Sequence, residues 1–162
     1  MTTPVGSARS MNIEDESAVL VGIARRERSR APMQTLGVAE VTTESGVAND
    51  ASGEPGDRQV TVITEESWRA ACAALDRELP WTMRRANLLI RGIELRGSIG
   101  ARLQVGDVVL QVTEENPPCF VMDRQYKGLR AALEPELRAG VACRVITSGR
   151  ISVGSPVVLT LS

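Results

Sequence analysis

The chain has 162 residues, a length that predicts one domain. Its formal net charge of −1 argues against sequence-independent nucleic-acid binding, because no overall positive field attracts a phosphate backbone. Aromatic residues make up 2% of the chain, too few for a base-stacking surface, and no apolar run is long enough to cross a membrane.

The residue types that carry most protein chemistry are sparse. There is no histidine, which excludes Ser–His–Asp and Cys–His catalysis and any histidine-ligated metal. The cysteines Cys72, Cys119 and Cys143 lack CxxC spacing and favour neither a zinc site nor a disulfide framework. The single lysine, Lys127, is expected to be solvated. No signal-peptide pattern begins the chain, so we expect a reducing, cytoplasmic location.

The first third of the chain predicts strands around one long loop. We expect residues 1–17 to form a disordered tail and residues 18–162 to form the folded domain. Val19–Ala24 and Thr35–Val41 are predicted strands. Residues 42–59 are rich in Gly, Ser, Asn, Asp and Pro and predict a loop, of a length that is usually functional or mobile.

A helix is predicted after a further strand, Val60–Ile63. Thr64 is a suitable N-cap and precedes an acidic first turn. Apolar residues then recur at three- and four-residue spacing and form one stripe: Trp68, Ala71, Cys72, Leu75 and Leu79. Pro80 is expected to end the helix, and Asn87–Ile93 is expected to form the next strand.

An internal similarity relates residues 102–110 (RLQVGDVVL) to residues 150–158 (RISVGSPVV). In each, a short strand meets a glycine turn and continues into a Val/Leu run, which predicts a corner. Two corners and several other short strands predict a mainly β fold, a closed or nearly closed β-barrel with a few short peripheral helices. Gly128–Leu137 is predicted to be helical and broken at Pro135, and Val141–Ile146 to be a strand.

Cys119 is the cysteine whose context favours chemistry. It follows Pro117 and Pro118, just after the predicted strand Val108–Thr113. The two prolines fix two φ angles, so the thiol is presented from a stiff loop. Arg124 would favour the thiolate, whereas three nearby carboxylates oppose it. The alternative is a small buried side chain without a role, which is what we expect for Cys72 and Cys143.

Two further segments carry charged groups that could bind an oxyanion. Asp57-Arg58-Gln59 closes the long loop that contains Asp50, and Arg84-Arg85-Ala86-Asn87 opens a strand. Guanidinium groups and backbone amides at glycine turns bind phosphate-like anions. Ordinary turn chemistry and a solvated charge run are the alternatives, and neither segment matches a Walker or dinucleotide fingerprint.

Four segments, in this order, resemble the MOSC family (molybdenum-cofactor sulfurase C-terminal domain), in particular its small stand-alone bacterial members. They are Gly46–Asp50 with Gly56–Ile63 (GDRQVTVI), Pro80–Leu95 (PWTMRRANLLIRGIEL), Leu103–Asp107 through the Pro118-Cys119 pair to Asp123, and Arg138–Val145 (RAGVACRV) with Gly149–Pro156. The resemblance covers about residues 18–161. Each motif is weak alone, but their order and spacing are specific.

The resemblance implies a β-barrel whose loops form a site for a molybdenum–pterin cofactor. It makes Cys119, the cysteine of the PC motif, the ligand of the metal or the carrier of transferable sulfur, and a thiolate is a soft ligand suited to such a metal. The candidates for holding the cofactor's phosphate and oxo groups are Asp57, Arg58, Arg85, Asn87 and Arg144.

The chain departs from the family pattern at three places. Ser52 or Gln59 stands where many relatives carry a histidine. Asn49 replaces the glycine before Asp50, and Ala139 replaces the first glycine of a GGV motif. An altered site is therefore one expectation.

The leading functional hypothesis is a stand-alone module that binds the cofactor, or carries sulfur for a donor or acceptor protein, with enzymatic activity left open. The first alternative is a molybdenum-dependent oxidoreductase of N-hydroxylated substrates, which needs a separate electron donor because no flavin, haem or iron–sulfur signature is present. The second is a cofactor-free interaction module. We expect no pyridoxal-phosphate domain, no second domain of the reductase type, and no nucleic-acid or membrane partner. Substrate and oligomeric state are not predicted.

Overall fold

The computed structural model describes residues 18–161, and the predicted tail of residues 1–17 lies outside them. The strands are β1 (Val19–Arg25), β2 (Gln34–Leu36), β3 (Val38–Thr42), β4 (Gly46–Val47), β5 (Val60–Thr64), β6 (Leu88–Arg91), β7 (Arg102–Val105), β8 (Val108–Glu115), β9 (Val141–Thr147), β10 (Gly149–Ser152) and β11 (Val157–Thr160). The helices are α1 (Glu65–Leu75), α2 (Val121–Gln125) and α3 (Leu129–Leu133), with the 3₁₀ helices η3 (Trp81–Arg84) and η4 (Pro135–Leu137).

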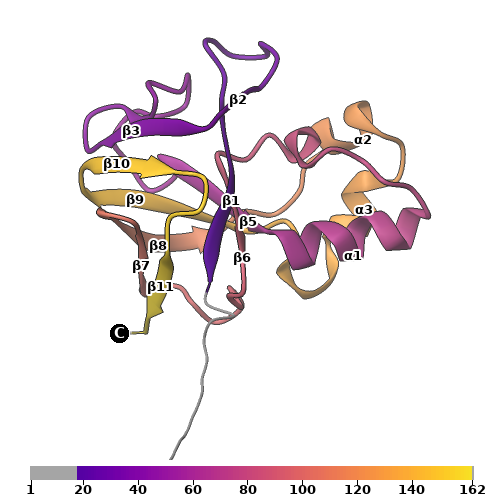
Figure 1. The fold of residues 1–162 in the computed structure, drawn as a ribbon. Coiled ribbons are helices and arrows are strands. Elements are labelled where there is room, and N and C mark those ends of the chain that lie inside the picture. The colour runs from indigo at the N-terminus through magenta and orange to yellow at the C-terminus, as the bar shows by residue number, and fades with distance from the viewer. Residues whose placement is uncertain (1–17, 162) are drawn as a thin grey trace, which may run out of the picture.

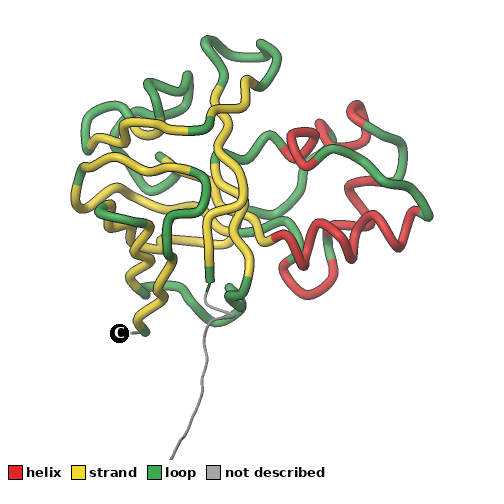
Figure 2. The backbone as a smooth tube through the Cα atoms, viewed as in Figure 1, coloured by secondary structure: helices red, strands yellow, loops and turns green. Residues whose placement is uncertain are grey.

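The strands form two sheets. The larger has the order β11-β7-β8-β9-β5-β6-β1-β2, and the smaller has the order β10-β3-β4. Pairing is antiparallel except between β5 and β6, which are parallel. Figures 1 and 2 show the strands on one side of the molecule and α1, α2 and α3 together on the other. The expectation of a mainly β fold with a few short helices is confirmed.

The expected barrel closure is not observed. β11 and β2 are the end strands of the larger sheet, and no ladder joins them. An isolated bridge pairs Val19 with Pro156. Backbone hydrogen bonds accompany the bridge, with the Leu20 amide donating to the Ser155 carbonyl at 2.9 Å and the Val157 amide to the Ala18 carbonyl at 3.0 Å. Beyond it, the chain from Val157 onward pairs with β7 and β1 from Ile23 onward pairs with β2. The contact is limited to this bridge, and no ladder closes the larger sheet.

The two similar segments do not form equivalent corners. Residues 102–110 form the β7–β8 hairpin, with Gly106 at φ +56° in its turn. In the second segment β10 pairs with β3 of the smaller sheet, whereas β11 pairs with β7 of the larger sheet. The second segment therefore carries the chain from one sheet to the other. Similarly, the predicted strand Thr35–Val41 is divided at Gly37 between the two sheets.

Helix α1 begins as predicted and ends early. The Ser67 amide donates to Thr64 Oγ1 at 3.0 Å, which caps the first turn. The helix ends at Leu75 because Asp76 takes a left-handed conformation with φ +53°, four residues before Pro80. No helix among residues 18–161 is long and apolar enough to cross a membrane.

The strands β5 and β6 separate two apolar cores. Val62 and Leu88 face a core built from both sheets, whereas Ile63 and Leu89 face a second core with α1 and α3. Successive side chains of a strand point to opposite faces, so these two strands bind both layers together. Cys143 is buried in the first core and Cys72 in the second, as predicted.

Candidate functional site

A cavity of about 700 Å³ brings Cys119 together with residues from four other segments of the chain. Its charged lining consists of five arginines and two carboxylates: Arg26, Arg30, Arg58, Arg84, Arg85, Asp50 and Glu54. Hereafter this space is called the arginine-lined cavity. The excess of guanidinium groups makes it suited to an anionic ligand.

The proline pair presents Cys119 at the surface, as the sequence predicted. Cys119 is exposed, whereas the other two free cysteines are buried. Burial raises the pKa of Cys143 to about 12, which makes that thiol inert. Arg124, which was expected to act on Cys119, instead stacks on the exposed Phe120 ring at 4.8 Å from its centroid. Positive charge near Cys119 therefore comes from other arginines.

One wall of the cavity is built around the buried carboxylate of Asp50. It accepts hydrogen bonds from the amide of Arg26 at 2.8 Å and the amide of Ser52 at 3.0 Å. The Arg26 guanidinium donates to Ser52 Oγ at 2.6 Å. The preceding Asn49 has φ +57°, a left-handed conformation that asparagine tolerates better than most residues. Asn49 therefore takes the role of the glycine expected there.

Arg58 lines another part of the cavity. One nitrogen of its guanidinium donates to Glu114 Oε1 at 2.8 Å, and another donates to Asn116 Oδ1. Asn116 is the residue before the proline pair, so Arg58 connects the loop before β5 to the Cys119 loop (residues 116–119).

The neighbours Arg84 and Arg85 have different surroundings. Arg85 donates to the carbonyl of Ala31 at 2.6 Å. Burial is the main cause that lowers the pKa of Arg85; the charge of Arg26 lowers it further, and the charge of Asp50 raises it. Arg84 is only 7% exposed. Burial lowers the pKa of Arg84 to about 10, with the nearby Cys119 opposing this shift and Arg58 adding to it. Nothing in the sequence of residues 81–85 indicates that Arg84, rather than Arg85, is the buried one.

Asn87 lines the cavity, but its amide connects strands. Its Oδ1 accepts from the amide of Thr61 at 3.0 Å, and its Nδ2 donates to the carbonyl of Ala24 at 3.2 Å. These bonds join β5 and β1 at the point where β6 begins.

Asp57 and Arg144 lie outside the arginine-lined cavity and form an ion pair with each other. Of the five residues predicted to hold the cofactor, the structure thus brings Arg58, Arg85 and Asn87 to the cavity that contains Cys119.

Ser52 and Gln59, the two candidates for the family's histidine position, have opposite environments. Ser52 is exposed and lines the cavity. Gln59 is buried, donates to the carbonyls of Thr43 and Gly53 at 2.8 and 3.0 Å, and accepts from the amide of Val145 at 2.9 Å. Gln59 therefore has a structural role, and Ser52 is the one that could contact a ligand.

The described residues cannot enclose a metal by themselves. Residues 18–161 contain no group of three or more His, Cys, Asp or Glu side chains placed to hold an ion. A metal beside Cys119 would need most of its ligands from a bound cofactor, and the cavity is large enough for one, because cofactor sites span roughly 300–1,000 Å³.

Comparison with known proteins supports the fold and the domain. The family model described as the MOSC domain matches residues 24–158. The crystal structure of YuaD from Bacillus subtilis has a TM-score of 0.76 at 14% identity, covering 90% of this chain and 97% of that one. YiiM from Geobacillus stearothermophilus has a TM-score of 0.72 at 18% identity, covering 88% and 74%, and YiiM from Escherichia coli has 0.67 at 16%, covering 89% and 70%. No curated protein matches the sequence significantly.

Proposed function

The chain belongs to the MOSC domain family, and on this premise we propose that it binds a molybdenum–pterin cofactor in the arginine-lined cavity, with Cys119 as the protein ligand of the metal. The observation that carries the proposal is the meeting of one exposed thiol with five arginines around one cavity. A thiolate ligand and a cationic pocket are the two features that an anionic, sulfur-ligated metal cofactor requires.

The residues present fit such a group. Arg26, Arg58 and Arg85 line the cavity with guanidinium groups that would bind the phosphate and the oxo groups of the cofactor. Ser52 and the backbone beside it add hydrogen-bonding groups at the same wall. When bound, the cofactor would supply a redox-active metal able to exchange oxo or sulfido groups. The chain would supply the thiolate and the anion-binding groups.

The deciding experiment measures metal and pterin separately. The full chain is produced in a host that makes the cofactor, and molybdenum is quantified by mass spectrometry while pterin is quantified as its fluorescent oxidised form. We expect Cys119→Ser to lose most of its molybdenum and Cys72→Ser, which removes a buried thiol, to keep it. Full molybdenum retention in Cys119→Ser would reject Cys119 as the ligand.

Sulfur carriage on Cys119 is the second candidate, because a persulfide needs an accessible thiol and Cys119 is exposed. Intact-mass analysis after incubation with a persulfide donor would reveal the added mass of one sulfur atom, removable by dithiothreitol and absent from Cys119→Ser. If no such adduct forms while the molybdenum content depends on Cys119, the carrier role is discarded.

Reduction of an N-hydroxylated compound by the loaded protein with a supplied electron donor would instead support an oxidoreductase.

A further inference from the structure

We propose that Arg84 is the positioning residue of Cys119, holding the Cys119 loop from both sides and directing an unneutralised positive charge at the thiol. The inference rests on Cys119 being the working residue of the proposed function. It concerns the protein without cofactor, so it can be tested whether or not molybdenum binds.

The contacts of Arg84 bracket Cys119 along the chain. Its Nη2 donates to the carbonyl of Asn116 at 2.7 Å, three residues before Cys119. Its Nη1 lies 3.8 Å from the sulfur of Met122, three residues after Cys119. One planar guanidinium therefore contacts both ends of the segment that presents the thiol. A lysine could not do this, because its ammonium lacks the fixed fork of donors.

The third contact anchors Arg84 to a rigid part of the fold. Its Nε donates to the carbonyl of Ala139 at 2.9 Å, and the next residue, Gly140, accepts from the amide of Asn116 at 3.0 Å. Gly140 has φ +93°, and a Cβ added there would lie 2.1 Å from the carbonyl oxygen of Val62. The backbone at Ala139–Gly140 is thus pressed against β5, so both acceptors of Arg84 are held in place.

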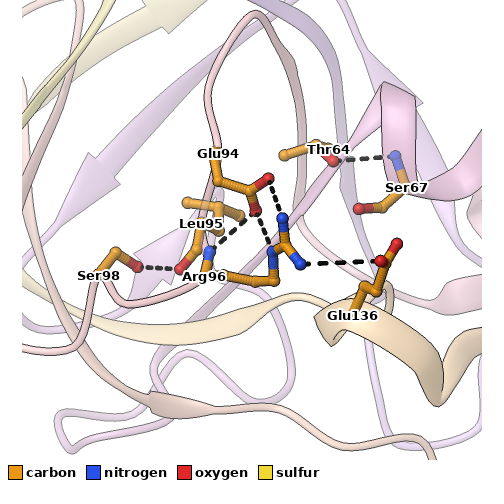
Figure 3. Close-up of polar contacts among 7 residues, drawn as sticks. All are labelled: Thr64, Ser67, Glu94, Leu95, Arg96, Ser98 and Glu136. Carbon is orange, nitrogen blue, oxygen red and sulfur yellow. Dashed lines mark hydrogen bonds and ion pairs between the residues drawn. The ribbon is translucent and has the colours of Figure 1, made fainter.

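The turn that leads into Ala139 is fastened on its outer side as well. Figure 3 shows Arg96 between Glu94 and Glu136, the latter in η4. Arg96 Nη1 lies 3.8 Å from Glu136 Oε2, and its Nε lies 3.2 Å from Glu94 Oε2. This exposed ion-pair group contributes little free energy by itself, but it links η4 to the segment after β6.

The charge of Arg84 has no carboxylate partner. None of the ion pairs formed among residues 18–161 includes it, and its three contacts are two carbonyls and a thioether, all neutral. Burying an unpaired cation costs free energy, and such a feature persists mainly at functional sites. For Arg85, in contrast, the charges that act on its pKa are those of Arg26 and Asp50 and not that of Cys119. Of the two adjacent arginines, Arg84 is therefore the one whose charge interacts with Cys119.

The test compares two alkylating reagents on the cofactor-free full chain. Iodoacetate is anionic and iodoacetamide is neutral, and both react with the same thiolate of Cys119. The ratio of their rates at one pH therefore cancels the thiolate fraction and reports the local electrostatic potential. We expect Arg84→Met to lower this ratio at least about threefold, the effect of removing one unit charge several ångströms away in a medium of intermediate dielectric constant. Arg85→Met is the matched control, and we expect less than half that effect.

Hydrogen exchange separates the mechanical role from the charge. We expect the amides of Asn116 and of residues 119–122 to exchange faster in both Arg84→Met and Arg84→Lys, because neither side chain can contact both flanks of Cys119. Arg84→Lys keeps a positive charge, so its rate ratio is expected to stay closer to that of the wild type than the ratio of Arg84→Met. If Arg84→Met does not fold, Arg84→Gln replaces it as the neutral variant. An unchanged ratio in the neutral variant, an equal fall in Arg85→Met, or unchanged exchange in the segment would overturn the proposal.

Discussion

The backbone amide of Arg26 donates a 2.8 Å hydrogen bond to the carboxylate of Asp50, which lies 24 residues away and is almost fully buried. The same carboxylate accepts from the amide of Ser52. One acidic side chain thus joins the end of β1 to the long loop and shapes a wall of the arginine-lined cavity.

This relationship predicts the effect of removing Asp50. In Asp50→Ala two backbone amides lose their acceptor, and we expect the free energy of unfolding to fall by about 1–3 kcal/mol. Urea unfolding followed by circular dichroism measures the change. Glu54→Ala, an exposed carboxylate of the same loop, is the control and should change stability by no more than about 0.5 kcal/mol. Equal effects of the two substitutions would contradict the structural role of Asp50.

The histidine position of the family can be tested by placing a histidine at each candidate. Gln59→His should destabilise the fold by about 2–4 kcal/mol, because buried donors and acceptors would lose a matched amide in a closely packed site. Ser52→His should be tolerated within about 1 kcal/mol, because Ser52 is exposed at the cavity. The reverse order of the two midpoints in urea would show that Gln59 is the more adaptable position.

Two glycines with similar φ angles offer a matched pair. Gly140 has φ +93° and Gly154 has φ +99°. An added Cβ at Gly140 would lie 2.1 Å from the Val62 carbonyl oxygen, whereas at Gly154 nothing lies within 4 Å. Gly154→Ala should therefore cost only the backbone strain, about 1–2 kcal/mol. Gly140→Ala should cost clearly more or prevent folding, and similar thermal midpoints for the two variants would argue against the close approach to β5.

The buried thiol of Cys143 makes the free energy of unfolding depend on pH in the alkaline range. Its pKa is raised to about 12 in the folded protein from 9.0, so the thiol stays protonated when folded while the unfolded chain ionises. The unfolded state then binds fewer protons, and the free energy of unfolding contributed by this group falls as pH rises from 9.0 towards about 12. The full contribution is present below pH 9.0.

The corresponding measurement is urea unfolding at several pH values between neutrality and pH 11. In Cys143→Ala the decline above pH 9 should be shallower than in the wild type, by up to about 1.4 kcal/mol for each pH unit. Cys72→Ala, which removes a buried thiol from the second core, is the control variant. Parallel pH profiles for wild type and Cys143→Ala would contradict this origin of the alkaline sensitivity.

Several structural features were predictable because their causes are local. The N-cap of α1 depends on Thr64 and the amide of Ser67, three residues away. Alternation within β9 placed Cys143 in the core, and the proline pair before Cys119 predicted an exposed, stiffly held thiol. The short helix α2 was not predicted, because its N-cap residue Phe120 makes no side-chain cap and its five residues are too few for a periodic pattern.

What the sequence determined by itself is the family, the mainly β composition and the identity of the exposed cysteine, since motif order, alternation and proline restrictions are all properties of short segments. Only the tertiary structure decided that the larger sheet stays open, that Arg144 pairs with Asp57 outside the cavity, and that Arg84 rather than Arg85 is buried and contacts both flanks of Cys119. These outcomes depend on which distant backbone groups and charges meet. No local pattern encodes that, because two adjacent arginines are chemically identical until the fold removes water from one of them.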